Sequence, residues 1–449
     1  MNEKRTPRID WLDYLKAFAL LGVIFNHLVE EIQPGSWFVR PSGIWAIFLE
    51  RVPNFLIQDS FSVSVIKILA WIGDFSPGVF ILASGFGLSW AALYHQDQDN
   101  IDWIKFLQRR LLRLFPLYIF LHLLFFAATL AKNGSTADYM SPNFLLSILG
   151  IRITDVLFFY INPSWWFVWL ILQLYIVFPF LYILLRRIGV GRFLFLACLL
   201  TFLSRLSGFV GFRYSESLYY WMLGIFFGTR LAEFCAGMAF AVLIKESARN
   251  QFQQLWESSQ IFLYSVLFLS IGLVSFFVRY GILVDYFFVT LGLSGLFYTI
   301  WKTVFERRNR SSHLITILGS ESYGIYLVHG LILQRVGRFL NGEWRLIGVI
   351  ALIVASLPIG IYLSRLMNFL VQKWVQGIRP PFPLGSWMRA QKTRKTPLLE
   401  DDRIIMNTDT VPKNLYKLYS PQNHRDVVAR HTLVQAGADN EHFDGKTTE

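Results

Sequence analysis

The sequence predicts an all-α integral membrane protein, a bundle of about ten transmembrane helices followed by a disordered polar C-terminal tail. Of its 449 residues, 54% are hydrophobic and only 16% are charged, and the mean hydropathy is +0.44. Apolar runs recur along most of the chain, and basic residues gather between alternate runs. This composition is typical of a protein that lies in the bilayer and excludes an ordinary soluble enzyme.

The apolar runs define the expected spans, each of a length that can cross a hydrocarbon core of about 30 Å as a helix. In chain order the spans are Tyr14–Ile32, Phe75–Tyr94, Leu111–Leu130, Trp165–Leu185, Phe193–Phe209, Trp221–Ile244, Ile261–Val278, Leu283–Trp301, Ile315–Leu333 and Leu346–Leu370.

The loops between these spans carry the orientation signal, because cytoplasmic loops hold an excess of Lys and Arg. An even number of spans with both termini in the cytoplasm places the main basic groups on one side, around Arg5, Arg110, Arg187, Lys245, Arg308 and Arg379. The opposite side keeps Arg40, Arg51, Arg205, Arg213, Arg335 and Arg338. This topology accounts for the net charge of +12, so we expect membrane lipids and no nucleic acid as partners.

The chain divides into a transmembrane domain, residues 1–375, and a cytoplasmic polar tail, residues 376–449. The tail starts basic and proline-rich and lacks a sustained period, which is typical of disordered segments. The whole chain has two cysteines, Cys198 and Cys235, and both lie inside apolar runs of the transmembrane domain. We therefore expect no disulfide framework, no metal site and no bound cofactor. The first apolar run lacks a cleavage site, so the first helix is expected to stay in the mature protein.

The first span contains two ionisable side chains, Lys16 and His27. At about 100° per residue, their separation of eleven positions amounts to roughly three turns plus 20°, so both lie on one helix face about 16 Å apart. Ionisable groups inside a span are costly and usually functional. The alternatives are a Lys16 amine that reaches the membrane interface and a His27 that serves only packing.

Several motifs follow one another in the order of a known family. The run from Ile9 to Lys16, followed by His27, resembles the first helix of the acyltransferase-3 family of membrane acyltransferases, where Arg or Lys precedes His at this spacing. Gly78 to Phe86, which ends in Ser84-Gly85-Phe86, resembles the family's Phe-rich run, and Arg110-Leu-Leu-Arg113 before Pro116 and Tyr118 resembles its Arg-x-x-Arg segment. Later residues also resemble landmarks of the family: Trp166-Phe167, Gln173, Tyr175, Pro179, Glu233-Phe234, Gly237, Ser322-Tyr323, Tyr326 and His329. The resemblance covers Ile9 to Leu370.

The resemblance implies an O-acyltransferase that moves an acetyl or other short acyl group from cytoplasmic acyl-CoA to a hydroxyl of a carbohydrate or lipid acceptor. His27 would act as the general base, because a buried imidazole stays neutral and can accept the hydroxyl proton. The alternative, in which His27 carries the acyl group covalently as a relay, stays open at this point. Lys16, the second catalytic candidate, would guide the donor or stabilise negative charge that develops during transfer.

Further residues are candidates for binding and support. Arg110 and Arg113, with Arg109 beside them, offer bidentate donors for the CoA phosphates, although the positive-inside rule alone also requires such a cluster. Ser84, Tyr323 and His329 complete the candidate substrate site; a small-residue packing surface is the alternative for Ser84, and a structural role for His329. Asp13, Glu30 and Glu31 are candidate supporting residues. Glu30 and Glu31 follow His27 at the helical spacing of three and four residues.

Two other classes of protein stay open at this point. A transporter or flippase of glycans or lipids would also have many helices and intramembrane charges, and so would a structural subunit. Release of CoA from acyl-CoA would distinguish the enzyme from both. The chain also departs from the family pattern in having Lys16 for the commoner Arg, and Ile171 where many members carry Glu, which leaves the acceptor class undefined.

Overall fold

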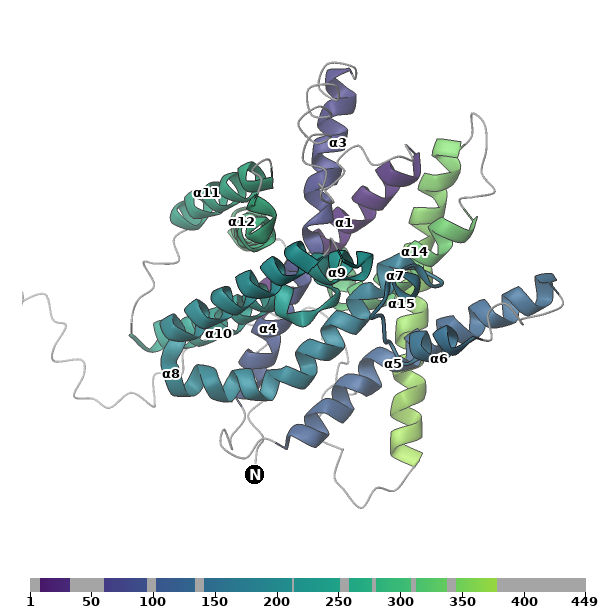
Figure 1. The fold of residues 1–449 in the computed structure, drawn as a ribbon, viewed down its shortest axis with the longest axis horizontal. Helices are drawn as coiled ribbons and strands as arrows, with labels where there is room; N and C mark the ends of the chain where they lie inside the picture. Colours follow the sequence, from purple (N-terminus) through teal and green to yellow (C-terminus); the bar gives the residue numbers. More distant parts are fainter. Residues whose placement is uncertain are drawn as a thin grey trace, which may run out of the picture. The chain divides into compact units, whose positions relative to one another are not determined.

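The computed structural model describes residues 9–32, 60–94, 102–133, 141–211, 214–250, 258–276, 280–307, 312–336 and 345–377 (Figure 1). Every regular element in these ranges is a helix, which confirms the predicted all-α class. The predicted tail lies almost wholly outside the described residues and stays a prediction.

The first half of the fold comprises α1 (Asp10–Ile32), α3 (Phe61–Asp74), α4 (Ser76–Tyr94), α5 (Trp103–Asn133), α6 (Pro142–Ile148), α7 (Asp155–Phe159), η1 (Pro163–Trp165) and α8 (Trp166–Gly211). The second half comprises α9 (Glu216–Tyr220), η2 (Trp221–Ile225), η3 (Phe227–Arg230), α10 (Leu231–Asn250), α11 (Ser258–Phe276), η5 (Gly281–Leu283), α12 (Asp285–Ile300), η6 (Trp301–Glu306), α13 (His313–Ser320), α14 (Ser322–Val336) and α15 (Arg345–Gly377).

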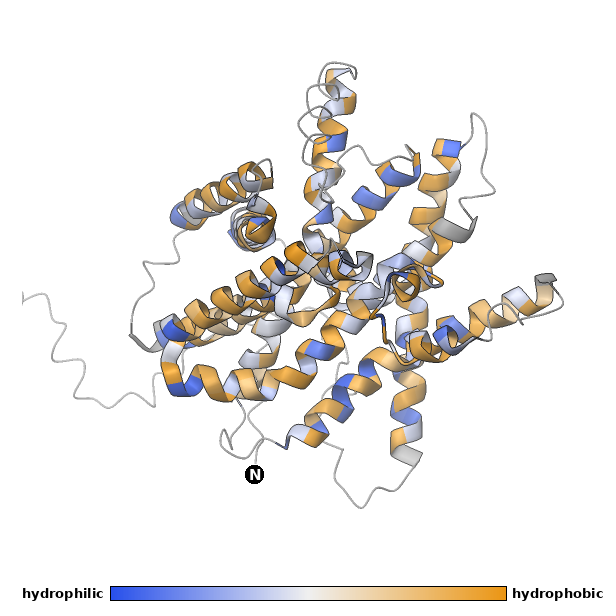
Figure 2. Cartoon of the chain, viewed as in Figure 1, coloured by the Kyte–Doolittle hydropathy of each residue, from blue (hydrophilic) through white to orange (hydrophobic). Residues whose placement is uncertain are grey.

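Eight helices of the described chain are long and apolar enough to cross a membrane, so the predicted count of about ten is not confirmed. One of the eight joins α3 to α4, and its first part, α3, extends a span that the sequence predicted to begin only at Phe75. Figure 2 shows apolar residues along most of each long helix. The multi-pass membrane character that composition predicted is thus present in the fold.

The difference between the predicted ten spans and the eight found has a local cause in α8. Gly189 has φ 76° and ψ 168°, a conformation that residues with a Cβ rarely adopt, and it divides α8 into two helical segments. These segments correspond to the two predicted spans Trp165–Leu185 and Phe193–Phe209. The predicted span Ile315–Leu333 is likewise divided, into α13 and α14, and its apolar part Ser322–Leu333 is shorter than a full crossing.

The predicted span Trp221–Ile244 does not begin as a regular helix. Residues Trp221–Ile225 form a π segment with Gly224 at φ 133°, and Phe227–Arg230 form a 3-10 turn before α10 starts. Gln173 on α8 holds this break, because its amide donates to the Ile225 carbonyl at 2.7 Å and accepts from the Phe227 amide at 3.2 Å. Irregular backbone at membrane depth is tolerated where protein groups satisfy it in this way.

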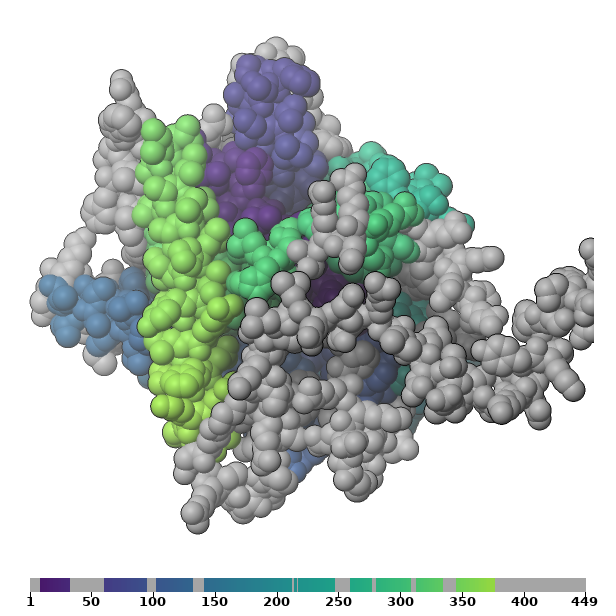
Figure 3. Space-filling view, turned by 180° about the vertical axis from the view of Figure 1, so that it is seen from behind, coloured from purple at the N-terminus to yellow at the C-terminus, as the bar shows by residue number. Residues whose placement is uncertain are grey.

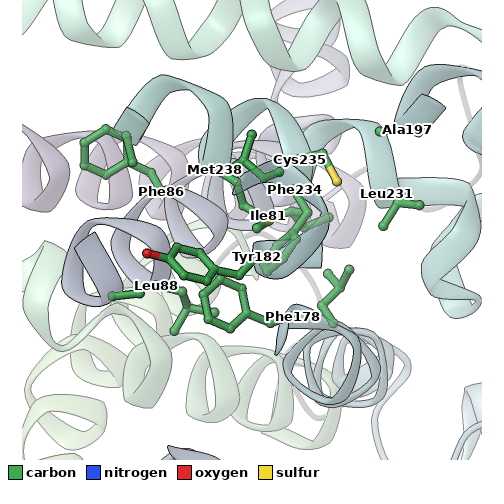
Figure 4. Close-up of a cluster of buried hydrophobic side chains, with 14 of the residues drawn as sticks. Ile81, Phe86, Leu88, Phe178, Tyr182, Ala197, Leu231, Phe234, Cys235 and Met238 are labelled. Atoms are coloured by element: carbon green, nitrogen blue, oxygen red, sulfur yellow. The ribbon is translucent and has the colours of Figure 1, made fainter. Parts of the chain in front are cut away.

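The largest core cluster lies where α4, α8 and α10 meet (Figure 4). Phe86, Phe178 and Phe234 are among its fully buried side chains. Glycines permit the close approach of α4 and α10: a Cβ on Gly85 would collide with the Phe234 carbonyl, and one on Gly237 with the Leu82 carbonyl. Small residues at such contacts are the usual means by which membrane helices pack closely.

The outer helices present apolar side chains to their surroundings. Seen from behind, α15 forms a continuous column of surface atoms beside α1 (Figure 3). Its exposed side chains include Leu346, Ile350, Val354, Tyr362, Phe369 and Trp374. A face of this kind would be unfavourable in water and is suited to lipid.

Candidate functional site

Two histidines from opposite ends of the chain meet in the fold. His27 Nδ1 on α1 lies 3.0 Å from His329 Nε2 on α14, and the two rings stack with centroids 5.2 Å apart and planes 14° apart. His329 is fully buried and His27 is half-buried. Both were candidate site residues in the sequence, but only the tertiary structure places them in contact.

The hydrogen bonds fix which nitrogen of each neutral ring carries the proton. His329 Nδ1 lies 3.1 Å from the Ile325 carbonyl oxygen, which can only accept, so Nδ1 is the protonated nitrogen of His329. His329 Nε2 must then accept, and His27 Nδ1 must donate to it. The remaining nitrogen of His27, Nε2, carries a lone pair and is the atom that can take a proton from a substrate.

The two carboxylates that follow His27 in the sequence, Glu30 and Glu31, do not hydrogen-bond to its ring. Glu31 has its carboxylate 3.6 Å from Arg345 Nη2, and its carbonyl accepts from the same nitrogen at 2.8 Å. Glu30 is exposed. The ring partner of His27 is therefore His329 and not either of the glutamates that the helical spacing suggested.

Lys16 lies on the same helix as His27, as predicted, because α1 runs without interruption from Asp10 to Ile32. The Lys16 amine donates to Asp13 Oδ1 at 2.7 Å, which places the supporting candidate Asp13 directly beside it. The side chains are 23% and 14% exposed, so the pair is neither fully solvated nor sealed. Close approach of α13 fixes this end of α1, since a Cβ on Gly319 would collide with the Asp13 carbonyl.

The arginine cluster lies at the start of α5. The Arg110 guanidinium is half-buried over the rings of Phe106 and Tyr175, at 5.4 and 5.9 Å from their centroids. Arg113 is exposed and Arg109 is half-buried. Tyr323, the neighbouring candidate on α14, donates its hydroxyl proton to the Leu114 carbonyl at 2.9 Å and so ties α14 to α5 next to Arg113.

Ser84 lies half-buried on α4. Its neighbour Gly85 makes the close approach to Phe234 described above. Gly85 therefore serves close helix packing, and the role of Ser84 stays a prediction.

The sequence did not indicate that the segment before α8 packs on α14 next to the histidine pair. Trp165, fully buried, donates its indole proton to the Leu327 carbonyl at 3.1 Å, and the Tyr326 hydroxyl donates to the Ser164 carbonyl. Arg152, also fully buried, donates to the carbonyls of Leu157, Phe158 and Tyr160 at 2.8, 2.9 and 3.1 Å. The turn at 160–165 is thus held against α14 at Tyr326 and Leu327, just before His329.

A second missed feature is a buried ionic cluster. Arg205 Nη1 lies 3.0 Å from Asp285 Oδ1, and Arg230 Nη1 lies 3.0 Å from Glu233 Oε1, with all four side chains at most 1% exposed. Both guanidinium groups lie over the Tyr286 ring, at 4.5 and 3.6 Å. The sequence placed Arg205 among loop residues on the non-cytoplasmic side; it is instead a buried residue that joins α8 to α12.

Within the described residues, no group of three or more His, Cys, Asp or Glu side chains is arranged to hold a metal ion.

Comparisons with known proteins show the family to which the chain belongs. The acyltransferase-3 family, described as an acyltransferase domain, matches residues 9–365. The chain is similar to the acyltransferase MdmB of Streptomyces mycarofaciens, with 23% identity over 398 residues that cover 82% of this chain and 92% of that protein. No solved structure matches the chain. The family match includes both helices that carry the histidine pair.

Proposed function

Since this chain belongs to the acyltransferase-3 family and is an acyltransferase of the membrane, we propose that it transfers a short acyl group from cytoplasmic acyl-CoA to a hydroxyl of a glycan, glycolipid or related acceptor. The observation that carries the proposal is the hydrogen bond between His27 and His329. It leaves His27 Nε2 as an oriented base, which is the group that an alcohol acceptor needs.

The proposed reaction proceeds as follows. His27 Nε2 takes the proton of the acceptor hydroxyl while that oxygen bonds to the thioester carbonyl carbon. The carbon–sulfur bond then breaks, and the proton passes to the CoA sulfur, so that the products are an ester and free CoA. His329 would keep the His27 ring in the productive tautomer and orientation, a function that commonly falls to the hydrogen-bond partner of a catalytic imidazole.

The donor is proposed to enter from the cytoplasmic side. In that topology both termini are cytoplasmic, and Arg110 and Arg113 receive the CoA phosphates through charge-assisted hydrogen bonds. The Lys16 amine, eleven residues before His27 on α1, would lie between the phosphates and the reacting carbonyl. The acceptor would then reach His27 from the opposite side.

The decisive experiment compares wild-type protein with His27→Ala in proteoliposomes supplied with acetyl-CoA and an extract of the host's glycans and lipids. Free CoA is measured with a thiol reagent, and acylated product by mass spectrometry. We expect His27→Ala to lose at least about a hundredfold in rate, the usual range of a general base being 10²- to 10⁴-fold.

The matched control is His313→Ala, which removes an exposed histidine at the start of α13 and should leave the rate unchanged. Normal product from a well-folded His27→Ala protein would refute the catalytic assignment. A transporter or structural subunit would release no CoA even with His27 intact.

A further inference from the structure

Asn162 is a buried amide whose side chain is only half satisfied. It is 0% exposed, and its Oδ1 accepts from the Ser164 amide at 2.9 Å, which fixes the orientation of the side chain. The other end, Nδ2, has no hydrogen-bond partner among the described residues. A buried donor without a partner destabilises the fold, so its presence calls for a reason.

The backbone next to Asn162 is strained. Ile161 has φ 63° and is the one non-glycine residue with a positive φ in the described part of the chain. A β-branched residue in this region is a genuine outlier and is strained. Such strain persists only where the surroundings hold it, and it gathers at functional sites.

The surroundings that hold the strained turn belong to the histidine site. On one side of the turn, the Tyr326 hydroxyl of α14 donates to the Ser164 carbonyl, and the Trp165 indole donates to the Leu327 carbonyl of α14. On the other, Gly330 directly follows His329, and a Cβ built on Gly330 would lie 3.0 Å from Asn162 Nδ2. The buried, unpartnered N–H group thus packs against the backbone of α14 at the residue next to His329, where only a glycine leaves room for it.

From this arrangement we infer that Asn162 Nδ2 is a hydrogen-bond donor to the carbonyl oxygen of the acyl group during transfer. The inference rests on the proposed function. When the acceptor oxygen adds to the thioester carbon, the electron pair of the C=O bond moves onto the carbonyl oxygen, while the hydroxyl proton moves to His27 Nε2. The imidazole is then occupied with that proton, so a separate donor must stabilise the negative oxygen. A fixed amide N–H group that already lacks a partner can stabilise the negative oxygen without first rearranging.

Two variants at this position separate a donor from a structural residue. Asn162→Asp keeps the size of the side chain and the oxygen that accepts from Ser164, but removes the N–H donor. Asn162→Ala removes both. Removal of one oxyanion donor typically lowers kcat by about 10²- to 10³-fold, and we expect both variants to show a loss in this range, with KM for acetyl-CoA little changed.

The assay is the acetyl-CoA and host-extract assay above, together with a thermal melt of each purified variant. Thr154→Ala serves as the control, because it removes a helix cap in the same segment, where Thr154 Oγ1 accepts from the Leu157 amide at 3.3 Å, without touching the histidine pair. We expect it to keep wild-type kcat even if it melts earlier.

A purely structural Asn162 predicts a different pattern, in which Asn162→Asp retains wild-type kcat and Asn162→Ala loses stability and activity together. That result would overturn the inference while leaving the proposed function intact, provided that wild type releases CoA and His27→Ala does not. Absence of CoA release from wild type itself would instead contradict the proposed function.

Discussion

His27 and His329 are 302 positions apart in the sequence, yet their ring nitrogens are 3.0 Å apart in the fold. The contact joins α1 to α14, and the Ile325 carbonyl sets its direction by fixing the proton on His329. Because the tautomer of His329 then determines that of His27, the pair acts as one unit. A change in either ring should therefore affect the same chemical step.

The first prediction concerns His329. His329→Ala removes the acceptor for the His27 Nδ1 proton, so the His27 ring can rotate or adopt the other tautomer. We expect kcat to fall at least about tenfold, within the general-base contribution of 10²- to 10⁴-fold, with little change in KM for acyl-CoA. His329→Gln supplies an amide oxygen that can accept, and should recover part of the rate. Equal rates for wild type and His329→Ala, measured by CoA release, would show that His27 acts without this partner.

The second prediction separates phosphate binding from topology at Arg110 and Arg113. Replacing either with Gln removes a charge-assisted hydrogen bond, which is worth about 1.5–3 kcal/mol, or roughly ten- to a hundredfold in apparent affinity for acyl-CoA. Lys at the same position keeps the charge that directs insertion but not the bidentate fork, so it should restore orientation fully and affinity in part. An unchanged dependence of rate on acyl-CoA in correctly inserted Gln variants would assign these arginines to topology alone.

The third prediction concerns the buried pair of Arg205 and Asp285. Arg205→Leu leaves a buried carboxylate without its main partner, so we expect a loss of about 3–5 kcal/mol in the free energy of unfolding. The double variant Arg205→Leu/Asp285→Leu removes both charges and should be less destabilised than the single one. Thermal unfolding in detergent measures both, with exposed Arg192→Leu as the control. A double variant as unstable as the sum of the two single ones would mean that the two charges do not interact.

The fourth prediction is that the C-terminal region faces the cytoplasm, as the alternating basic loops indicate. A single cysteine introduced by Ser386→Cys, in a background where Cys198 and Cys235 are replaced by Ala, should react with a membrane-impermeant thiol reagent only after cell lysis. Labelling of intact cells would show that the C-terminal region faces the outside, and it would contradict the proposed entry of acyl-CoA from the cytoplasm.

Several features of this protein follow from the sequence alone. The all-α membrane class follows from composition and apolar runs, and the family follows from an ordered set of motifs. The shared helix of Lys16 and His27 follows from local periodicity, since the spacing of residues within a helix needs no knowledge of the rest of the fold. The continuous helix α1 confirms that step.

Only the tertiary structure decided which side chains meet. The spacing along α1 offered Glu30 and Glu31 as partners of His27, but the packing of α14 on α1 brings in His329 and leaves Glu31 to Arg345. Arg205 was counted with the loop charges although it falls in the predicted span Phe193–Phe209, and its partner Asp285, 80 positions away, is evident only in the fold. The number of crossings also depended on backbone breaks at Gly189 and around Glu321, which hydropathy does not register. The sequence specifies local periodicity, whereas contacts between distant helices depend on how their faces pack. The buried amide of Asn162, whose N–H group has no hydrogen-bond partner among the described residues, could be recognised only in the fold.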